Sequence, residues 1–342
     1  MDWPEDREFR ILSIDGGGIR GIFPSGVLAE LEARYLGGAA IGSYFDLIVG
    51  SSTGGIIAVG LGARLSAADI LRLYRDDGRD IFPSSGSPLE WLGRKRRWLM
   101  RKYDRDKLEE RLRTILGAKT LGDSSSRLCI PSCDGTHGDI WVFKTPHHPD
   151  FRKDRDKSLV EVALATSAAP TYFRPLEQGG YRLLDGGVWA NNPIMVGLVE
   201  ALSSFSVPRE RIRILSIGCG ARSYEVGWRK MRIGGMWHWR DIMTGAMSYQ
   251  SHAALGQARL LVGAEQVTRI EPPPRAAAIG LDDWKRASAE LPAAAVRAVD
   301  EYGDAVAASF MDQLAERYSP VVHVDLPLGG GEGQKGKQDR TA

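Results

Sequence analysis

The chain has 342 residues with a formal net charge of +2, and its 43% of hydrophobic residues suffice for one large core. No apolar run approaches the roughly 20 residues that cross a bilayer, and the acidic first residues do not resemble a signal peptide. Because three cysteines are too few for a disulfide framework, we expect a cytoplasmic protein with no structural metal and no nucleic-acid polymer as partner.

The first element is a predicted strand at residues 9–14, which runs into a glycine loop and then a predicted helix. Consecutive glycines let backbone N–H groups turn toward one point, and such a nest binds an anion. The loop is therefore a candidate for binding a phosphate or an oxyanion, and an arginine adds positive charge. Its residues are Asp15, Gly16, Gly17, Gly18, Ile19, Arg20 and Gly21.

The same glycines match a dinucleotide-binding pattern, Gly-x-Gly-x-x-Gly, from Gly16 to Gly21. That pattern needs an acidic residue at the end of a second strand, about 20 residues further on. Here the second predicted strand ends at Gly50 and leads into a serine turn. We therefore rank cofactor binding below oxyanion stabilisation and expect no cofactor.

The second predicted strand covers residues 44–49, and a small, apolar helix is predicted over residues 54–63. Between them lies a Gly-x-Ser-x-Gly turn, with Gly50, Ser52 and Gly54 at its fixed positions. In a nucleophile elbow this turn is so tight that only glycine fits beside the serine, whose hydroxyl is held exposed. The helix that follows points its free N–H groups at the same spot. Ser52 is therefore the candidate nucleophile.

Two later stretches interleave aromatic and basic residues. Residues 91–107 are strongly basic and residues 228–239 surround a glycine pair. Each is a candidate for contact with anionic lipid headgroups or nucleotide phosphates, and the second also for a lid. The alternative for residues 91–107 is an ordinary solvated surface, and the alternative for residues 228–239 is burial against a second subunit. The residues that we select are Arg94, Arg96, Arg97, Trp98 and Trp237.

The rest of the chain alternates strands and helices, which indicates a mainly parallel sheet covered on both faces. We expect one domain over residues 1–328 and a disordered, Gly-, Lys- and Gln-rich tail over residues 329–342. The predicted strands are residues 128–131, 140–144, 180–184, 212–217 and 266–270. The predicted helices are residues 159–165, 241–262 and 294–317, and a further one begins with Asn192 and Pro193.

The short strand at residues 180–184 ends in Asp185, Gly186 and Gly187. The end of a strand is the usual place for a catalytic side chain on an α/β scaffold. An Asp-Gly turn alone is common and carries no function. Together with an anion-binding loop and a nucleophilic serine, however, it supplies a carboxylate base. These three motifs make a complete site for acyl transfer to water.

The three motifs resemble those of the patatin-like phospholipases: an Asp-Gly-Gly-Gly-x-Arg-Gly loop, a Gly-x-Ser-x-Gly elbow and a distal Asp-Gly-Gly. Residues 167–173 resemble a fourth block of that family, Ser-Ala-Ala-Pro-x-x-Phe, and Asn191-Asn192-Pro193 resembles the continuation after its aspartate. The resemblance implies a three-layer α/β/α hydrolase and lipid acyl hydrolysis by a Ser–Asp dyad without a metal. The implied dyad is Ser52 and Asp185, and the implied oxyanion site is framed by Gly16, Gly17, Gly18 and Arg20.

A Ser-His-Asp triad stays open at this point. Ordinary hydrolases place the histidine after the acid, and His238, His252 and His323 all follow Asp185. None lies in a turn typical of a catalytic loop, so we interpret all three as non-catalytic.

The resemblance leaves two biological roles. One is a constitutive esterase or lipase. The other is an antiphage effector that a cyclic oligonucleotide activates to degrade the cell's own membrane phospholipids, peripheral at the inner membrane, with a homo-oligomer as an open option. The length and the missing signal favour the second. A non-catalytic nucleotide- or lipid-binding module is the alternative from another class, and the intact Ser52 and Asp185 speak against it.

Overall fold

The computed structural model describes residues 1–81, 103, 105–220, 224–233, 242–316 and 318–321. Most of the basic stretch, the end of the aromatic stretch and the C-terminal tail from residue 329 lie outside these ranges. The selected residues Arg94, Arg96, Arg97, Trp98 and Trp237 therefore lie outside the described residues. In the described part of the chain, no helix is both long and apolar enough to cross a bilayer.

An eight-stranded sheet with the order β5-β6-β3-β2-β1-β7-β8, in which β4 also pairs with β3, organises the fold. Parallel pairing joins β1, β2, β3, β7 and β8, while β4 and β6 pair antiparallel with β3, and β5 pairs antiparallel with β6. The predicted, mainly parallel sheet is confirmed. The strands are β1 (Phe9–Ile14), β2 (Leu47–Gly50), β3 (Leu128–Asp134), β4 (Asp139–Lys144), β5 (Leu176–Gln178), β6 (Tyr181–Asp185), β7 (Ile212–Ile217) and β8 (Val267–Ile270).

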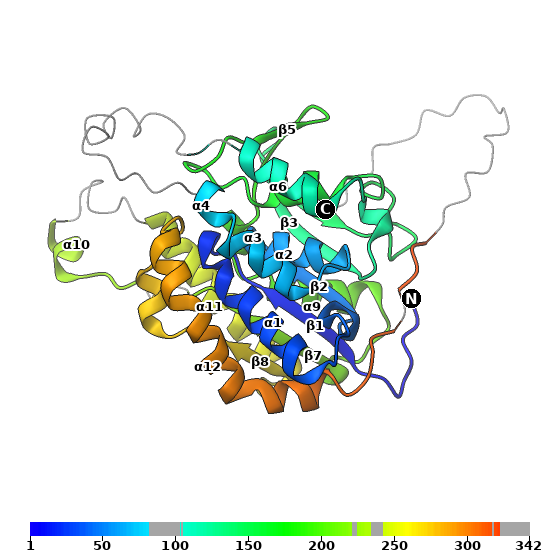
Figure 1. Cartoon of the computed structure of the whole chain (residues 1–342). Coiled ribbons are helices and arrows are strands. Elements are labelled where there is room, and N and C mark those ends of the chain that lie inside the picture. The colour runs from blue at the N-terminus through cyan, green and yellow to red at the C-terminus, as the bar shows by residue number, and fades with distance from the viewer. Residues whose placement is uncertain (82–102, 104, 221–223, 234–241, 317, 322–342) are drawn as a thin grey trace, which may run out of the picture.

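Helices cover both faces of this sheet (Figure 1). One core joins the sheet to α1, α2 and α12, and the other joins it to α9 and α11. The fold is thus the expected three-layer α/β/α arrangement. The helices are α1 (Ile22–Tyr35), α2 (Thr53–Gly62), α3 (Ala67–Arg75), α4 (Gly78–Ile81), α6 (Asp106–Leu116), α7 (Leu159–Thr166), α8 (Gly187–Ala190), α9 (Ile194–Ser204), α10 (Trp228–Ile233), α11 (Ile242–Val262) and α12 (Trp284–Phe310).

Strand β1 shows why the central strands are apolar throughout. Its side chains alternate between the two faces, so that Leu12 and Ile14 enter the first core while Phe9 and Ile11 enter the second. All six residues of the strand are buried. A strand covered on both faces loses the polar alternation of a surface strand, and the continuous apolar run in the sequence reflects that burial.

Several predicted boundaries differ from the structure. The helix expected to end at residue 317 ends at Phe310, and the helix expected to begin with Asn192 and Pro193 begins at Ile194, with Pro193 as its N-cap. The strand expected from residue 44 begins at Leu47, because residues 41–44 form a 3₁₀ turn before it. The helix expected over residues 294–317 begins at Trp284, where the Asp283 side chain accepts the amide of Arg286 at 3.2 Å. Pro292 lies inside this helix. Proline removes one backbone hydrogen bond there, and the packing of α12 against α1 retains the helix around it.

Candidate active site

The serine turn joins the end of β2 to the start of α2. A Cβ on Gly50 would lie 2.1 Å from the carbonyl oxygen of Gly54, and a Cβ on Gly54 would lie 2.1 Å from that of Ile14. Only glycine fits at either position, because α2 starts close to the end of β2, which precedes it, and close to the end of β1 beside it. Ser52 itself has φ 54° and ψ −120°, a conformation that residues other than glycine rarely adopt and that is typical of functional turns.

The Ser52 hydroxyl donates a hydrogen bond to Asp185, with 2.6 Å between Oγ and Oδ2. The other carboxylate oxygen, Oδ1, accepts the backbone amide of Gly187 at 2.6 Å. Asp185 is only 5% exposed, and burial raises its pKa to about 6, although the hydrogen bonds from Ser52 and Gly187 act in the opposite direction. A carboxylate with this pKa is a stronger base than an exposed aspartate and is still ionised at neutral pH.

The topology of β3 explains how these two side chains meet. Strand β4 occupies one edge of β3, from Cys129 to Asp134. The other edge is shared by β2, which pairs at Leu128 and Cys129, and β6, which pairs from Ser132 onward in the opposite direction. The C-terminal ends of β2 and β6 therefore face each other along one edge of β3. The serine follows one end and the aspartate closes the other.

The glycine loop lies beside Ser52, and its three glycines differ in what they do. The amide of Gly16 donates to the carbonyl of Asn191 at 2.9 Å, so it is already used. The amides of Gly17 and Gly18 donate to no acceptor among the residues that the structure describes. Gly18 has φ 57°, and a Cβ there would lie 2.3 Å from the carbonyl oxygen of Leu281. The loop thus needs glycine and leaves two amides available.

Arg20 stabilises the glycine loop by bonding backbone oxygens. Its Nη1 donates to the carbonyl of Gly220 at 2.6 Å and its Nε to the carbonyl of Gly17 at 3.3 Å. Burial lowers the pKa of this guanidinium, and the nearby Cys219, Glu271, Tyr172 and Asp15 oppose that shift. Arg20 therefore brings positive charge to the loop, but its hydrogen bonds to the described residues hold the backbone and do not reach Ser52.

A buried ion pair that we did not predict anchors the start of the glycine loop. Arg269 on β8 donates to Asp15 through Nη1 at 3.0 Å and Nη2 at 2.5 Å. Both side chains are almost completely buried. Although burial alone would lower it, Asp15 and Glu271 raise the pKa of Arg269. The available sign in the sequence was a charged residue between the buried ends of a short strand, because a buried charge needs a partner.

A cavity of about 650 Å³ opens beside the dyad and the glycine loop. Ser52, Asp185 and Gly17 line one part of it. Much of the remaining lining is hydrocarbon, which suits an acyl chain better than a charged ligand. The apolar lining includes Ile56, Leu73, Tyr74, Ile81, Leu108 and Phe173.

No histidine contacts the dyad in the described part of the chain. The side chain of Asp185 bonds Ser52 and Gly187 there, and His252 is exposed on α11. His238 and His323 lie outside the described residues.

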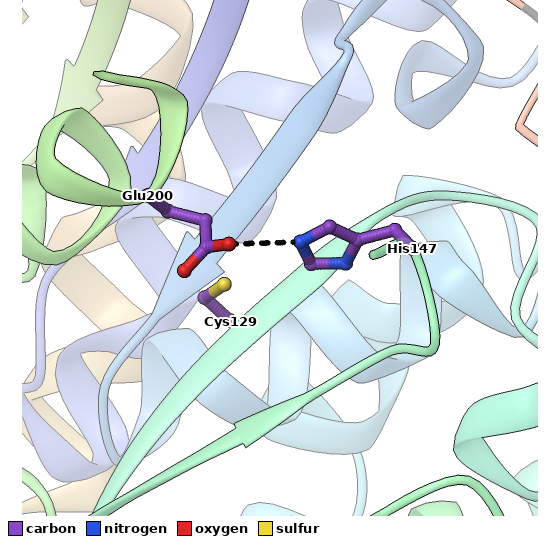
Figure 2. Close-up of side chains that lie close together, drawn as sticks. All are labelled: Cys129, His147 and Glu200. Carbon is purple, nitrogen blue, oxygen red and sulfur yellow. Dashed lines mark hydrogen bonds and ion pairs between the residues drawn. The ribbon is translucent and has the colours of Figure 1, made fainter. Parts of the chain in front are cut away.

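Cys129, His147 and Glu200 are close together on the face of the sheet that α9 covers, and their potential ligand atoms lie within 4.8 Å of one another. Figure 2 shows the imidazole of His147 directed at the carboxylate of Glu200, and these groups are 3.1 Å apart. Although these residue types bind metals, Lys144 already pairs with Glu200 at 2.7 Å. Ser204 also donates to this carboxylate at 2.5 Å. We interpret the cluster as a buried hydrogen-bond network that is complete without an ion.

A family model described as patatin-like phospholipase matches residues 12–198. The chain belongs to this family. It resembles three curated proteins named cGAMP-activated phospholipase. The one from Escherichia coli is 39% identical over 64% of this chain and 64% of its own length. The one from Pseudomonas aeruginosa is 37% identical over 66% of this chain and 69% of its own length. The one from Vibrio cholerae is 36% identical over 64% of this chain and 66% of its own length. The matches thus span about two thirds of these relatives.

The fourth patatin block, residues 167–173, forms part of the cavity wall. Ser167, Ala169 and Pro170 line the cavity together with Tyr172 and Phe173. The patatin continuation after Asp185 also contributes to the site, since it supplies the carbonyl that binds the Gly16 amide. These two patatin motifs therefore build the surroundings of the dyad.

Proposed function

We propose that this patatin-like protein hydrolyses acyl esters of membrane phospholipids, with Ser52 as nucleophile and Asp185 as base. The observation that carries the proposal is the 2.6 Å hydrogen bond between the two side chains on the wall of a cavity with apolar lining. Family membership supports the same reaction class. The names of the three relatives support the phospholipid substrate.

The reaction follows from the geometry in two steps. Asp185 takes the hydroxyl proton while Ser52 Oγ attacks the ester carbonyl, and the proton then passes to the leaving alcohol as the carbonyl–oxygen bond breaks. Asp185 next takes a proton from water as the water oxygen attacks the acyl-enzyme. It passes that proton to Ser52 Oγ as the bond between Oγ and the acyl carbon breaks and the fatty acid leaves. The amides of Gly17 and Gly18 bind the oxyanion, and one such donor is typically worth about 3 kcal/mol. Gly16 and Arg20 hold the loop in shape.

We also propose that a cyclic dinucleotide activates the enzyme, with antiviral defence as its role. The three relatives, named as cGAMP-activated, support this regulation. The protein would then act peripherally at the membrane. Two side chains of α10 support such a contact, because Trp228 is 61% and Met231 74% exposed. A constitutive lipase remains the second candidate, favoured by the dyad being already hydrogen-bonded.

Fatty-acid release from mixed phospholipid vesicles tests both proposals. We expect release by the wild-type protein that rises when one member of a panel of cyclic di- and trinucleotides is added, and no release by Ser52→Ala. Equal release with and without every nucleotide would support the lipase activity and contradict activation by a cyclic nucleotide. Release by Ser52→Ala at the wild-type rate would contradict the assignment of Ser52 as the nucleophile.

The pH dependence of turnover is expected to report the base. Asp185 must be ionised to accept a proton, and burial raises its pKa to about 6. Activity should therefore rise with pH and reach half of its plateau near pH 6, whereas an ordinary aspartate would give a midpoint near 4. A soluble short-chain ester, assayed from pH 4.5 to 8.5, avoids titration of lipid headgroups. A plateau that is already flat at pH 5 would contradict the assignment.

A further inference from the structure

Thr166 ends α7, directly before the fourth patatin block, and is completely buried. Its hydroxyl oxygen accepts the backbone amide of Ser52 at 3.0 Å and donates to the carbonyl of Pro131 at 2.6 Å. One hydroxyl thus fills both of its roles and connects the serine turn to β3. Among the described residues, the Ser52 amide donates to this side chain and not to a backbone carbonyl.

The same segment also holds the aspartate turn. The carbonyl of Thr166 accepts the amide of Gly186 at 3.2 Å, and the carbonyl of Ala168 accepts that of Asp185 at 3.1 Å. The Thr166 methyl group packs against α2, where a Cβ on Gly55 would lie 2.6 Å from it. Thr166 therefore contacts Ser52, the helix that follows the serine turn and the residue after Asp185 through three different groups.

The conformation of Ser52 explains why this support matters. A non-glycine residue at φ 54° persists only when its surroundings fix it. The hydrogen bond to Thr166 acts on the amide of that very residue. Without an acceptor, the Ser52 amide would lose its partner in a half-buried turn, and the backbone could relax toward an ordinary conformation that moves Oγ away from Asp185.

We propose that Thr166 is a positioning residue whose hydroxyl holds the Ser52 backbone so that Oγ stays on Asp185. The proposal rests on the proposed dyad. It makes the residue before the Ser-Ala-Ala-Pro block part of the catalytic geometry, although Thr166 does not touch the substrate. Small misplacements of reacting groups have large effects on rate because the reaction depends on a near-attack geometry.

The test compares Thr166→Val, which keeps the shape and loses the hydroxyl, with Thr166→Ser, which keeps the hydroxyl. With the soluble ester we expect kcat to fall about 10- to 100-fold in the valine variant with KM little changed, and to stay within a few-fold of wild type in the serine variant. Thr145→Val is the matched control, because its buried hydroxyl likewise accepts a strand amide, that of Leu128 at 2.9 Å, at the start of β3. Its kcat should be unchanged.

A second readout separates positioning from packing. The hydrogen bond from Ser52 lowers the pKa of Asp185, so loosening it should move the acid limb of the pH profile to higher pH in Thr166→Val, and Thr145→Val should not move it. If Thr166→Val fails to fold, Thr166→Ala takes its place. Unchanged kcat in the valine variant, or an equal loss in the serine variant, would overturn the proposal. Full activity of both Ser52→Ala and Asp185→Ala would instead overturn the dyad itself.

Discussion

Replacing Asp185 with asparagine is expected to abolish turnover and to stabilise the folded protein at neutral pH. Asparagine keeps the shape and can still accept the Gly187 amide, but it cannot take a proton from Ser52. By analogy with other serine hydrolases whose base is disabled, we expect a fall in kcat of about 10³- to 10⁴-fold.

The stability gain follows from the raised pKa. A folded-state pKa of about 6, against 3.8 for an ordinary aspartate, means that the folded protein prefers the protonated carboxyl. The contribution of the protonated Asp185 to the free energy of unfolding is therefore fully present below pH 4 and is lost as the pH rises through 6. At pH 7.5 the ionised Asp185 costs about 3 kcal/mol, from about 1.4 kcal/mol per pKa unit, and the neutral amide avoids most of this cost.

Urea unfolding at pH 7.5 and at pH 4 measures this effect. We expect Asp185→Asn to exceed the wild type by about 2–3 kcal/mol at pH 7.5 and to equal it near pH 4. Asp150→Asn, at a carboxylate whose side chain is 84% exposed, is the control and should show no such difference. A variant that is less stable than wild type at pH 7.5 would show that burial of the ionised Asp185 carboxylate does not destabilise the folded protein.

The glycine motifs carried most of what the sequence could predict. A turn that admits only glycine limits the backbone locally, so Gly50 already indicates how close the strand and the helix of the turn must come, while Gly54 lies against the end of β1. The apolar run of β1 indicates burial on both faces for a similar reason. These inferences depend on residues that are neighbours along the chain, which is why the strand and the turn were placed correctly.

Contacts between distant parts of the chain explain what the sequence could not show. Nothing near Gly16 in the sequence indicates that its amide donates to the carbonyl of Asn191, because only folding brings these two distant residues together. Thr166 is one threonine at the end of an apolar helix, and its role depends on the closeness of Ser52. The proposed nucleophile and base can be predicted from motifs in the sequence, whereas the contacts that hold these two residues in place appear only in three dimensions.

Replacing Arg269 with methionine is expected to destabilise the fold by about 3–5 kcal/mol at neutral pH, which is the usual effect of removing one partner of a buried ion pair. The side chains of Arg269 and Asp15 are 7% and 2% exposed, so water cannot replace the lost guanidinium. Because Asp15 opens the glycine loop, kcat should also fall. Urea unfolding of the purified variant measures the first effect, and hydrolysis of the soluble ester measures the second.

The double variant Asp15→Asn/Arg269→Met shows whether a buried charge is the cause. Without Arg269, burial and Glu271 raise the pKa of Asp15 against the opposing charge of Arg20. The single variant should therefore lose more stability at pH 8 than at pH 5, and the asparagine should recover part of the loss at pH 8. Arg34→Met removes a guanidinium from the exposed ion pair with Asp300 and should change stability far less. Equal effects of Arg269→Met and Arg34→Met would mean that the pair does not hold the loop. A large loss that the double variant partly reverses would instead show that the glycine loop is anchored electrostatically from β8.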